Sequence, residues 1–213
     1  MMKPLNGLSR VAALAWFAAQ VSPTSLAAQS IIEDWATVQV PPPPSLSEVT
    51  VAPQTTALLV LDIVQKACNA EVRPRCIAML PRVQTLLANA RAKGLFVVYT
   101  LRAGDTRADI RPEVAMRGDE PLITSTPDKY VGSELEKILK DRGIKTVITI
   151  GVAAQGAVLH TAAGSAFRGF NVIVPVDGVA SETAYAEQYT AWDLVNAPRL
   201  ADKVRLTKID MIK

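Results

Sequence analysis

The chain has 213 residues, which is enough for one domain with a sizeable hydrophobic core. Apolar residues make up 49% of it and charged residues 20%, a composition typical of a globular protein and not of a disordered one. The formal net charge is only +3, and no basic stripe is interleaved with aromatic residues, so we expect no nucleic-acid partner.

The first 28 residues have the pattern of a signal peptide. Lys3 and Arg10 make the start positively charged, residues 11–21 are almost entirely apolar, and the small residues Ala27 and Ala28 both suit cleavage. The apolar stretch is shorter than the roughly 20 residues that a membrane-spanning helix needs. We therefore predict an exported protein, periplasmic or secreted, that has no membrane association after the signal is removed.

Residues 29–54 are predicted to form an N-terminal arm or linker. Four consecutive prolines at 41–44 favour an extended, solvated polyproline conformation. Apolar residues such as Ile31 and Trp35 are expected to pack on the body of the protein or on a neighbouring subunit. Residues 55–213 are assigned to the folded domain.

The body alternates between strand and helix patterns. Short, continuously apolar runs predict strands that are buried on both faces. Helical periodicity fills the intervals between them, whereas the polar stretch 102–120 has no clear period and predicts a loop. In chain order the elements are a strand at 57–61, a helix at 77–93, strands at 95–100 and 122–124, a helix at 133–142, a strand at 146–151, a helix at 156–168, a strand at 171–176, a helix at 182–196 and a strand at 204–207.

This alternation predicts an α/β fold with a mainly parallel sheet between helices. Ligands of such sheets bind beyond the carboxyl ends of the strands, so the residues just past those ends are the candidates for chemistry. Asp62 follows the first strand directly. A carboxylate there is partly desolvated, as a general acid or base requires, but it also suits a helix cap or a loop anchor.

The segment Gly151–Ala157 is the second candidate. A strand runs into a helix through small residues, so backbone N–H groups at the helix start can approach a ligand oxygen. Close packing alone can also require small residues there. The segment lacks the Gly-Lys-Ser/Thr of a phosphate loop and the glycine spacing of a dinucleotide site.

Other polar residues near the strand ends remain open between binding and structural roles. Arg102 suits a substrate carboxylate or a cover for the loop, and Thr124 and Tyr130 flank the segment that follows the third strand. Gln155 is either a pocket donor or a surface residue. His160, the only histidine, is either turned to the pocket or a structural residue, and the second is the more common role for a lone histidine on a helix.

Cys68 and Cys76 are the only cysteines. In an oxidising compartment they favour a disulfide. A redox pair or a thiolate that reaches the Asp62 pocket is the alternative, and it lacks a nearby histidine to activate it. A single histidine also cannot complete a two-histidine zinc site, so we expect no metal and no other cofactor.

Two stretches resemble one family. They are ALLVLD at 57–62 and YVGSELEKILKDRGIKTVITIGVAAQGAVLHTAAGSAFRGFNVIVPVDGVASE at 130–182, and together they resemble the isochorismatase-like (cysteine hydrolase) domains over residues 55–210. The resemblance implies a three-layer α/β/α sandwich with a six-stranded, mainly parallel sheet. It also implies a small-molecule substrate and a homo-oligomer.

The resemblance assigns roles residue by residue. The acid/base aspartate of the family falls on Asp62, and a cis peptide between Val152 and Ala153, with the N–H groups of Ala153 and Ala157, would form an oxyanion-type hole. The nucleophilic cysteine of the family maps to Ala157, which has no nucleophile.

The lysine of the family is not found at its expected spacing. Counting back from Tyr130 reaches Thr124, and Lys129 is the nearby alternative source of an ammonium. The sequence therefore predicts a hydrolase of small molecules that uses Asp62 for proton transfer and no cysteine, with vinyl-ether or C–N bonds as its targets. The alternative is an inactive binding protein on the same fold.

Overall fold

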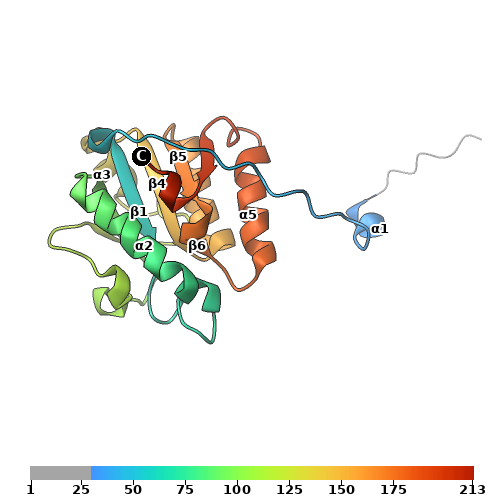
Figure 1. The fold of residues 1–213 in the computed structure, drawn as a ribbon, viewed down its shortest axis with the longest axis horizontal. Helices are drawn as coiled ribbons and strands as arrows, with labels where there is room; N and C mark the ends of the chain where they lie inside the picture. Colours follow the sequence, from blue (N-terminus) through green and yellow to red (C-terminus); the bar gives the residue numbers. More distant parts are fainter. Residues whose placement is uncertain (1–29) are drawn as a thin grey trace, which may run out of the picture. The chain divides into compact units, whose positions relative to one another are not determined.

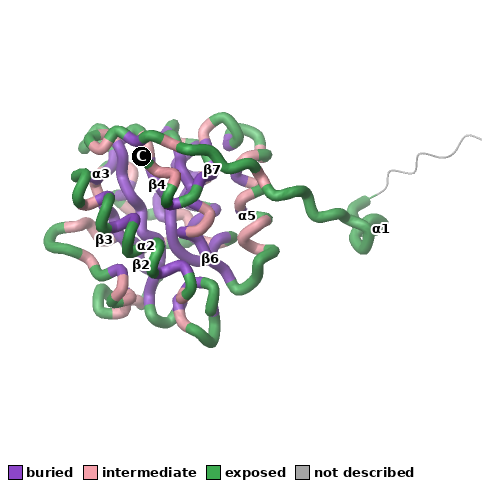
Figure 2. Tube along the Cα trace, viewed as in Figure 1, coloured by how far each residue is buried: buried purple, intermediate pink, exposed green. Residues whose placement is uncertain are grey.

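The computed structural model describes residues 30–213, and the predicted signal peptide lies outside the described residues. Contacts divide the described chain into two units, residues 30–40 and 41–213. In the first unit Ser30 caps the short helix α1 (Ile31–Asp34) through a reciprocal capping box with Glu33. Every residue of this unit is exposed, including the apolar side chains that were expected to pack (Figure 2).

The second unit is built on a parallel sheet (Figure 1). Its main path runs in the order β3-β2-β1-β4-β5-β7, and the short strand β6 pairs with β4 beyond the end of β5. All of these pairings are parallel. The strands are β1 (Thr56–Leu61), β2 (Phe96–Leu101), β3 (Leu122–Thr124), β4 (Thr146–Val152), β5 (Asn171–Pro175), β6 (Val179–Ala180) and β7 (Val204–Thr207).

Helices cover both faces of this sheet, so the predicted three-layer α/β/α fold is confirmed. Strand β1 is buried along its whole length, and its side chains alternate between two apolar clusters. Leu58 and Val60 belong to the cluster beneath α2 (Pro74–Ala92), whereas Leu59 and Leu61 belong to the opposite one. The helices of that opposite face are α3 (Leu135–Asp141), α4 (Leu159–Phe167) and α5 (Ala184–Asn196).

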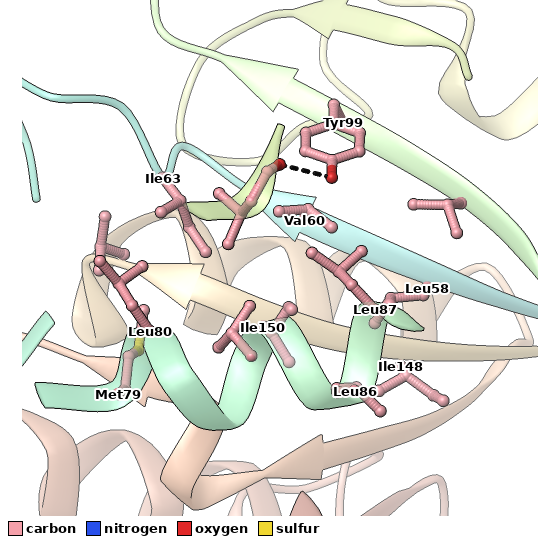
Figure 3. Close-up of a cluster of buried hydrophobic side chains, with 14 of the residues drawn as sticks. Leu58, Val60, Ile63, Met79, Leu80, Leu86, Leu87, Tyr99, Ile148 and Ile150 are labelled. Atoms are coloured by element: carbon pink, nitrogen blue, oxygen red, sulfur yellow. Dashed lines mark hydrogen bonds between the residues drawn. The ribbon is translucent and has the colours of Figure 1, made fainter. Parts of the chain in front are cut away.

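The cluster beneath α2 includes one tyrosine with a satisfied hydroxyl (Figure 3). The Tyr99 hydroxyl donates a hydrogen bond to the carbonyl oxygen of Val114 at 2.7 Å. Burial raises the pKa of Tyr99 to about 12, so the hydroxyl stays a donor at any physiological pH. This bond ties the loop after β2 to the sheet.

Most element boundaries agree with the sequence patterns to within three residues. The fold adds β6, which has only two residues and therefore no readable period. It also turns parts of the 102–120 loop into single 3₁₀ turns at Arg107–Asp109 and Pro112–Val114. The helix predicted from Gly156 begins instead with a π-helical turn over Ala154–Val158, before α4.

The second half of the predicted arm is part of the body. The backbone N–H of Ser47 donates to Leu206, that of Val49 donates to Met211, and that of Val51 donates to Lys213. Because these bonds attach residues 47–51 to the C-terminal segment, only residues 30–40 remain separate from the compact unit. No helix in the described range 30–213 is long and apolar enough to cross a membrane.

Candidate active site

A pocket of about 460 Å³ lies where β1, β2 and β4 end, at the edge that the parallel topology predicts for a ligand. Its wall combines three charged side chains with small and apolar ones. The lining residues are Asp62, Ala67, Arg73, Arg102, Ala103, Ser125, Thr126, Pro127, Val152, Ala153, Gly156 and Ala157.

Asp62 is the acidic residue of the pocket wall. Its side chain is buried, and both carboxylate oxygens accept hydrogen bonds, Oδ1 from the hydroxyl of Thr100 at 2.7 Å and Oδ2 from Nζ of Lys129 at 2.8 Å. The backbone of Asp62 has φ +54, a left-handed conformation that is uncommon outside glycine. Such a conformation is retained where the surroundings impose it, which is frequent at functional sites.

Lys129 is the lysine that contacts Asp62. The spacing of the family had pointed to position 124, which is a threonine. The side chain of Lys129 is fully buried, and besides Asp62 it donates to the carbonyl oxygens of Leu101 at 3.2 Å and Ser125 at 3.3 Å. These three acceptors match the three donors of an ammonium group. Lys129 is therefore fixed as a partner of Asp62 and does not itself line the pocket.

The turn after β4 forms the wall facing Asp62. Gly151 has φ +127, and a Cβ built on it would lie 2.0 Å from the carbonyl oxygen of Leu61, so only glycine allows β4 to run this close to β1. The structure contains the cis peptide between Val152 and Ala153 that the resemblance implied. Within residues 30–213 the Ala153 N–H makes no hydrogen bond, so it is free to donate to a ligand.

Ala157 also lines the pocket, in the π-helical turn that follows. Its methyl group places no nucleophile next to Asp62. Any attacking group other than water must therefore come from elsewhere in the wall, and the two serine and threonine hydroxyls there, Ser125 and Thr126, bond backbone carbonyl oxygens of their own loop.

Besides Lys129, four predicted site residues do not line the pocket. Thr124 and His160 are exposed, because the end of β3 and the first turn of α4 direct these side chains to solvent. Tyr130 is buried on the other side of its loop, where its hydroxyl meets Ser165 at 2.8 Å. Gln155 points outward and accepts a hydrogen bond from Ser181 at 2.5 Å.

Sequence patterns missed Arg73 altogether. It lies directly before α2, is 7% exposed and lines the pocket. Its guanidinium donates to the carbonyl oxygen of Ala67 and forms an ion pair with Glu182. Nothing in the sequence pairs the two residues, because Arg73 and Glu182 are distant along the chain and only the fold brings them together.

Glu182 is strongly biased toward its charged form. Burial alone would raise its pKa, but hydrogen bonds from Ser181, from its own backbone N–H, from Gln155 and from Arg73 together lower the pKa to about 2. The Arg73–Glu182 pair is therefore charged throughout the physiological range.

Cys68 and Cys76 are joined in a disulfide, with Cα atoms 5.4 Å apart. Both are fully buried, so neither presents a thiolate to the Asp62 pocket. The disulfide closes the loop that carries Arg73. Within residues 30–213, no three or more His, Cys, Asp or Glu side chains gather as a metal ion would require.

The sequence model of the isochorismatase domain matches residues 56–204, which include the whole pocket. The chain belongs to the isochorismatase family. A secreted isochorismatase effector, Isc1, of Verticillium dahliae is 27% identical over 149 residues, covering 64% of this chain and 76% of the effector. An N-carbamoylsarcosine amidase of Arthrobacter is 26% identical over 151 residues, covering 58% of this chain but only 57% of the amidase.

Solved structures agree on the fold. An isochorismatase-like hydrolase from Alkaliphilus metalliredigens superimposes with a TM-score of 0.66 at 22% identity, covering 73% of this chain and 95% of that one. Members of the isochorismatase-like family are hydrolases, and the position of the pocket on this fold agrees with an enzyme of that class.

Proposed function

We propose that this protein is an exported hydrolase of a small molecule, in which Asp62 transfers protons and water is the nucleophile. The observation that carries the proposal is the buried Asp62–Lys129 pair, 2.8 Å from Nζ to Oδ2, whose aspartate lines the same pocket as a turn with a free Ala153 N–H. A carboxylate placed in this way contributes about 100- to 10,000-fold to a proton-transfer step.

The absence of a thiol at position 157 favours vinyl-ether hydrolysis over amide hydrolysis. In that reaction Asp62 acts in its protonated form, having first taken up a proton from solvent, and gives this proton to the terminal vinyl carbon, which leaves a cation on the ether-bearing carbon. Water adds to this cation and returns a proton to Asp62. The resulting hemiketal breaks its C–O bond, so the products are a ketone and an alcohol.

The chain's own residues have separate tasks in this scheme. Lys129 and Thr100 hold the two carboxylate oxygens in one orientation, so the proton is delivered along a fixed direction. The free N–H of Ala153, together with the Ala157 N–H, would orient the substrate oxygen and stabilise charge that develops on it.

Two features support export. The start of the sequence has the signal-peptide pattern, and a disulfide joins the only two cysteines, as oxidising compartments favour. The Verticillium relative is itself described as secreted. A homo-oligomer, a small-molecule substrate and the division into signal, arm and hydrolase domain complete the proposal.

The test is turnover by the mature chain and by Asp62→Asn. Pyruvate release from isochorismate-type vinyl ethers and ammonia release from small amides would be followed in parallel. Asp177→Asn is the matched control, because Asp177 also follows a strand of the sheet but bonds the Ile209 N–H at 2.9 Å and does not line the pocket.

We expect vinyl-ether turnover in the wild type and in Asp177→Asn, and a loss of at least 100-fold in Asp62→Asn. Turnover of amides alone would replace the ether assignment. No turnover on either class, with ligand binding retained, would establish the alternative of a binding protein on a hydrolase fold.

A further inference from the structure

Arg73 has an incomplete set of hydrogen bonds. A guanidinium has five N–H donors, and the structure gives Arg73 two partners, the Ala67 carbonyl on Nη1 and the Glu182 carboxylate on Nη2. Its Nε is buried and has no partner within the described chain. Buried donors without partners are rare in folded proteins, because each one loses its hydration without compensation.

Other arginines of the same chain satisfy this donor in a regular way. Arg75, Arg91 and Arg102 each place Nε and Nη2 together on the two oxygens of one carboxylate. This fork is the arrangement in which arginine binds carboxylates most strongly. Arg73 uses only the Nη2 half of the same edge, so its fork is half occupied.

The residue that carries this half-occupied fork is part of the pocket wall. Arg73 lines the same cavity as Asp62, Ala153 and Ala157. Of the charged side chains that line this cavity, Asp62 is neutralised by Lys129 and Arg102 has its fork on Asp105. Of the two arginines in the pocket wall, Arg73 is thus the one whose Nε–Nη2 edge is only half used within the described chain.

Two further contacts prepare Arg73 to exchange partners. The Cys68–Cys76 disulfide closes the loop on which it lies, which limits the freedom of its backbone. Glu182 has a side chain that is 43% exposed and has Ser181 and Gln155 as other partners, so it can release Arg73 while keeping hydrogen bonds.

We propose that Arg73 is the residue that recognises a carboxylate on the substrate, with Glu182 occupying part of its guanidinium until the substrate binds. This inference rests on the proposed function, because it assigns the substrate class of the same pocket. A small molecule with a carboxylate would take Nε and Nη2 together. An uncharged molecule of the same shape would leave Nε without a partner.

The test is a binding measurement that does not depend on turnover. Benzoate and nitrobenzene are planar and similar in shape, but only benzoate is charged, and both fit a pocket of about 460 Å³. Their affinities for the mature chain would be measured by calorimetry or ligand-observed NMR. The variants are Arg73→Gln and, as a matched control, Arg75→Gln, which changes an arginine two residues away that does not line the pocket.

We expect benzoate to bind more tightly than nitrobenzene to the wild type. Arg73→Gln should weaken benzoate by about 10- to 100-fold, as for the loss of a hydrogen bond between charged groups, and leave nitrobenzene unchanged. Arg75→Gln should change neither. Equal binding of the two probes, no binding of benzoate, or equal weakening of both by Arg73→Gln would overturn the inference.

A second variant keeps the test decisive if Arg73→Gln does not fold. Glu182→Gln leaves Arg73 in place and removes its competing charge, so benzoate should bind several-fold more tightly and nitrobenzene should not change. An unchanged benzoate affinity in that variant would overturn the inference. Turnover separates the two proposals, because a chain that binds benzoate through Arg73 but hydrolyses nothing refutes only the hydrolase.

Discussion

Two ion pairs lie at the pocket, and they are built differently. In Asp62–Lys129 both partners are buried, each N–H of the ammonium has an acceptor, and each carboxylate oxygen accepts a hydrogen bond. In Arg73–Glu182 the arginine is buried and its Nε has no partner within the described chain, while the glutamate is 43% exposed and has other partners.

The difference separates a fixed pair from an exchangeable one. When both charges of a pair are buried and each is held by further hydrogen bonds, the pair keeps one geometry. A charged group with an unpartnered donor gains a hydrogen bond when a ligand brings an acceptor. The first arrangement suits proton transfer in a constant direction, and the second suits recognition of a ligand.

Breaking the fixed pair should have the largest effect. In Lys129→Met the Asp62 carboxylate stays buried without its counter-ion, and we expect a loss of about 3–5 kcal/mol in the free energy of unfolding together with most of the activity. Denaturant titration and turnover measure the two effects. The double variant Asp62→Asn with Lys129→Met removes both charges, so it should recover much of the stability and none of the activity; a double variant as unstable as Lys129→Met would contradict this explanation.

Opening the disulfide should have the next largest effect. Replacing Cys68 and Cys76 by serine removes the constraint on a short loop, and the loop-entropy estimate gives a loss of about 2–3 kcal/mol in stability. Because Arg73 lies on this loop, the preference for benzoate over nitrobenzene should shrink as well. Thermal unfolding with and without a reductant, beside the probe affinities, measures both; an unchanged preference would show that the loop does not position Arg73.

The Arg73–Glu182 pair should make the folded chain less stable as the pH falls. The pKa of Glu182 is lowered from 4.5 to about 2 in the folded chain, so its contribution is present above pH 4.5 and is lost as the pH falls toward 2. Glu182→Gln should therefore lose less stability than the wild type between pH 4.5 and 2. Parallel curves for the two proteins in that window would contradict the cause given for the shift.

Removing residues 30–40 should have the smallest effect. None of these residues is buried, and residues 41–213 contain both ion pairs and the core. A chain that begins at Pro41 should keep its unfolding temperature within about 2 °C and its turnover within a factor of two. Sedimentation of both chains would show whether the exposed apolar side chains of the arm contribute to assembly.

Much of the fold follows from local patterns. The run ALLVL is apolar without interruption, and TVITIG is rich in β-branched residues, because both faces of a parallel strand are covered by helices; this signal is readable in a short window. The two-residue strand β6 and the five-residue π-helical turn before α4 were not readable, since each spans only about one period of its own pattern and so shows no repeat.

The site could be predicted only in part from local patterns. Asp62 and the turn at Val152–Ala153 follow strands, so the order of elements was enough to bring them to one edge of the sheet. Tyr130 and His160 also lie near strand ends or helix starts, but the direction of a side chain from a loop or a helix depends on its packing. Spacing could not assign that direction, and both residues point away from the pocket.

The sequence by itself determined the α/β class, six of the seven strands in the described chain, the aspartate at the end of β1 and the alanine where a cysteine was expected, because each depends on residues that are close along the chain. Only the tertiary structure decided that Lys129 and not Thr124 meets Asp62, and that Arg73 enters the pocket with Glu182 as its partner. Those pairings join segments that are far apart in the sequence, and charged groups are brought together by the packing of the elements that carry them, which no local pattern records.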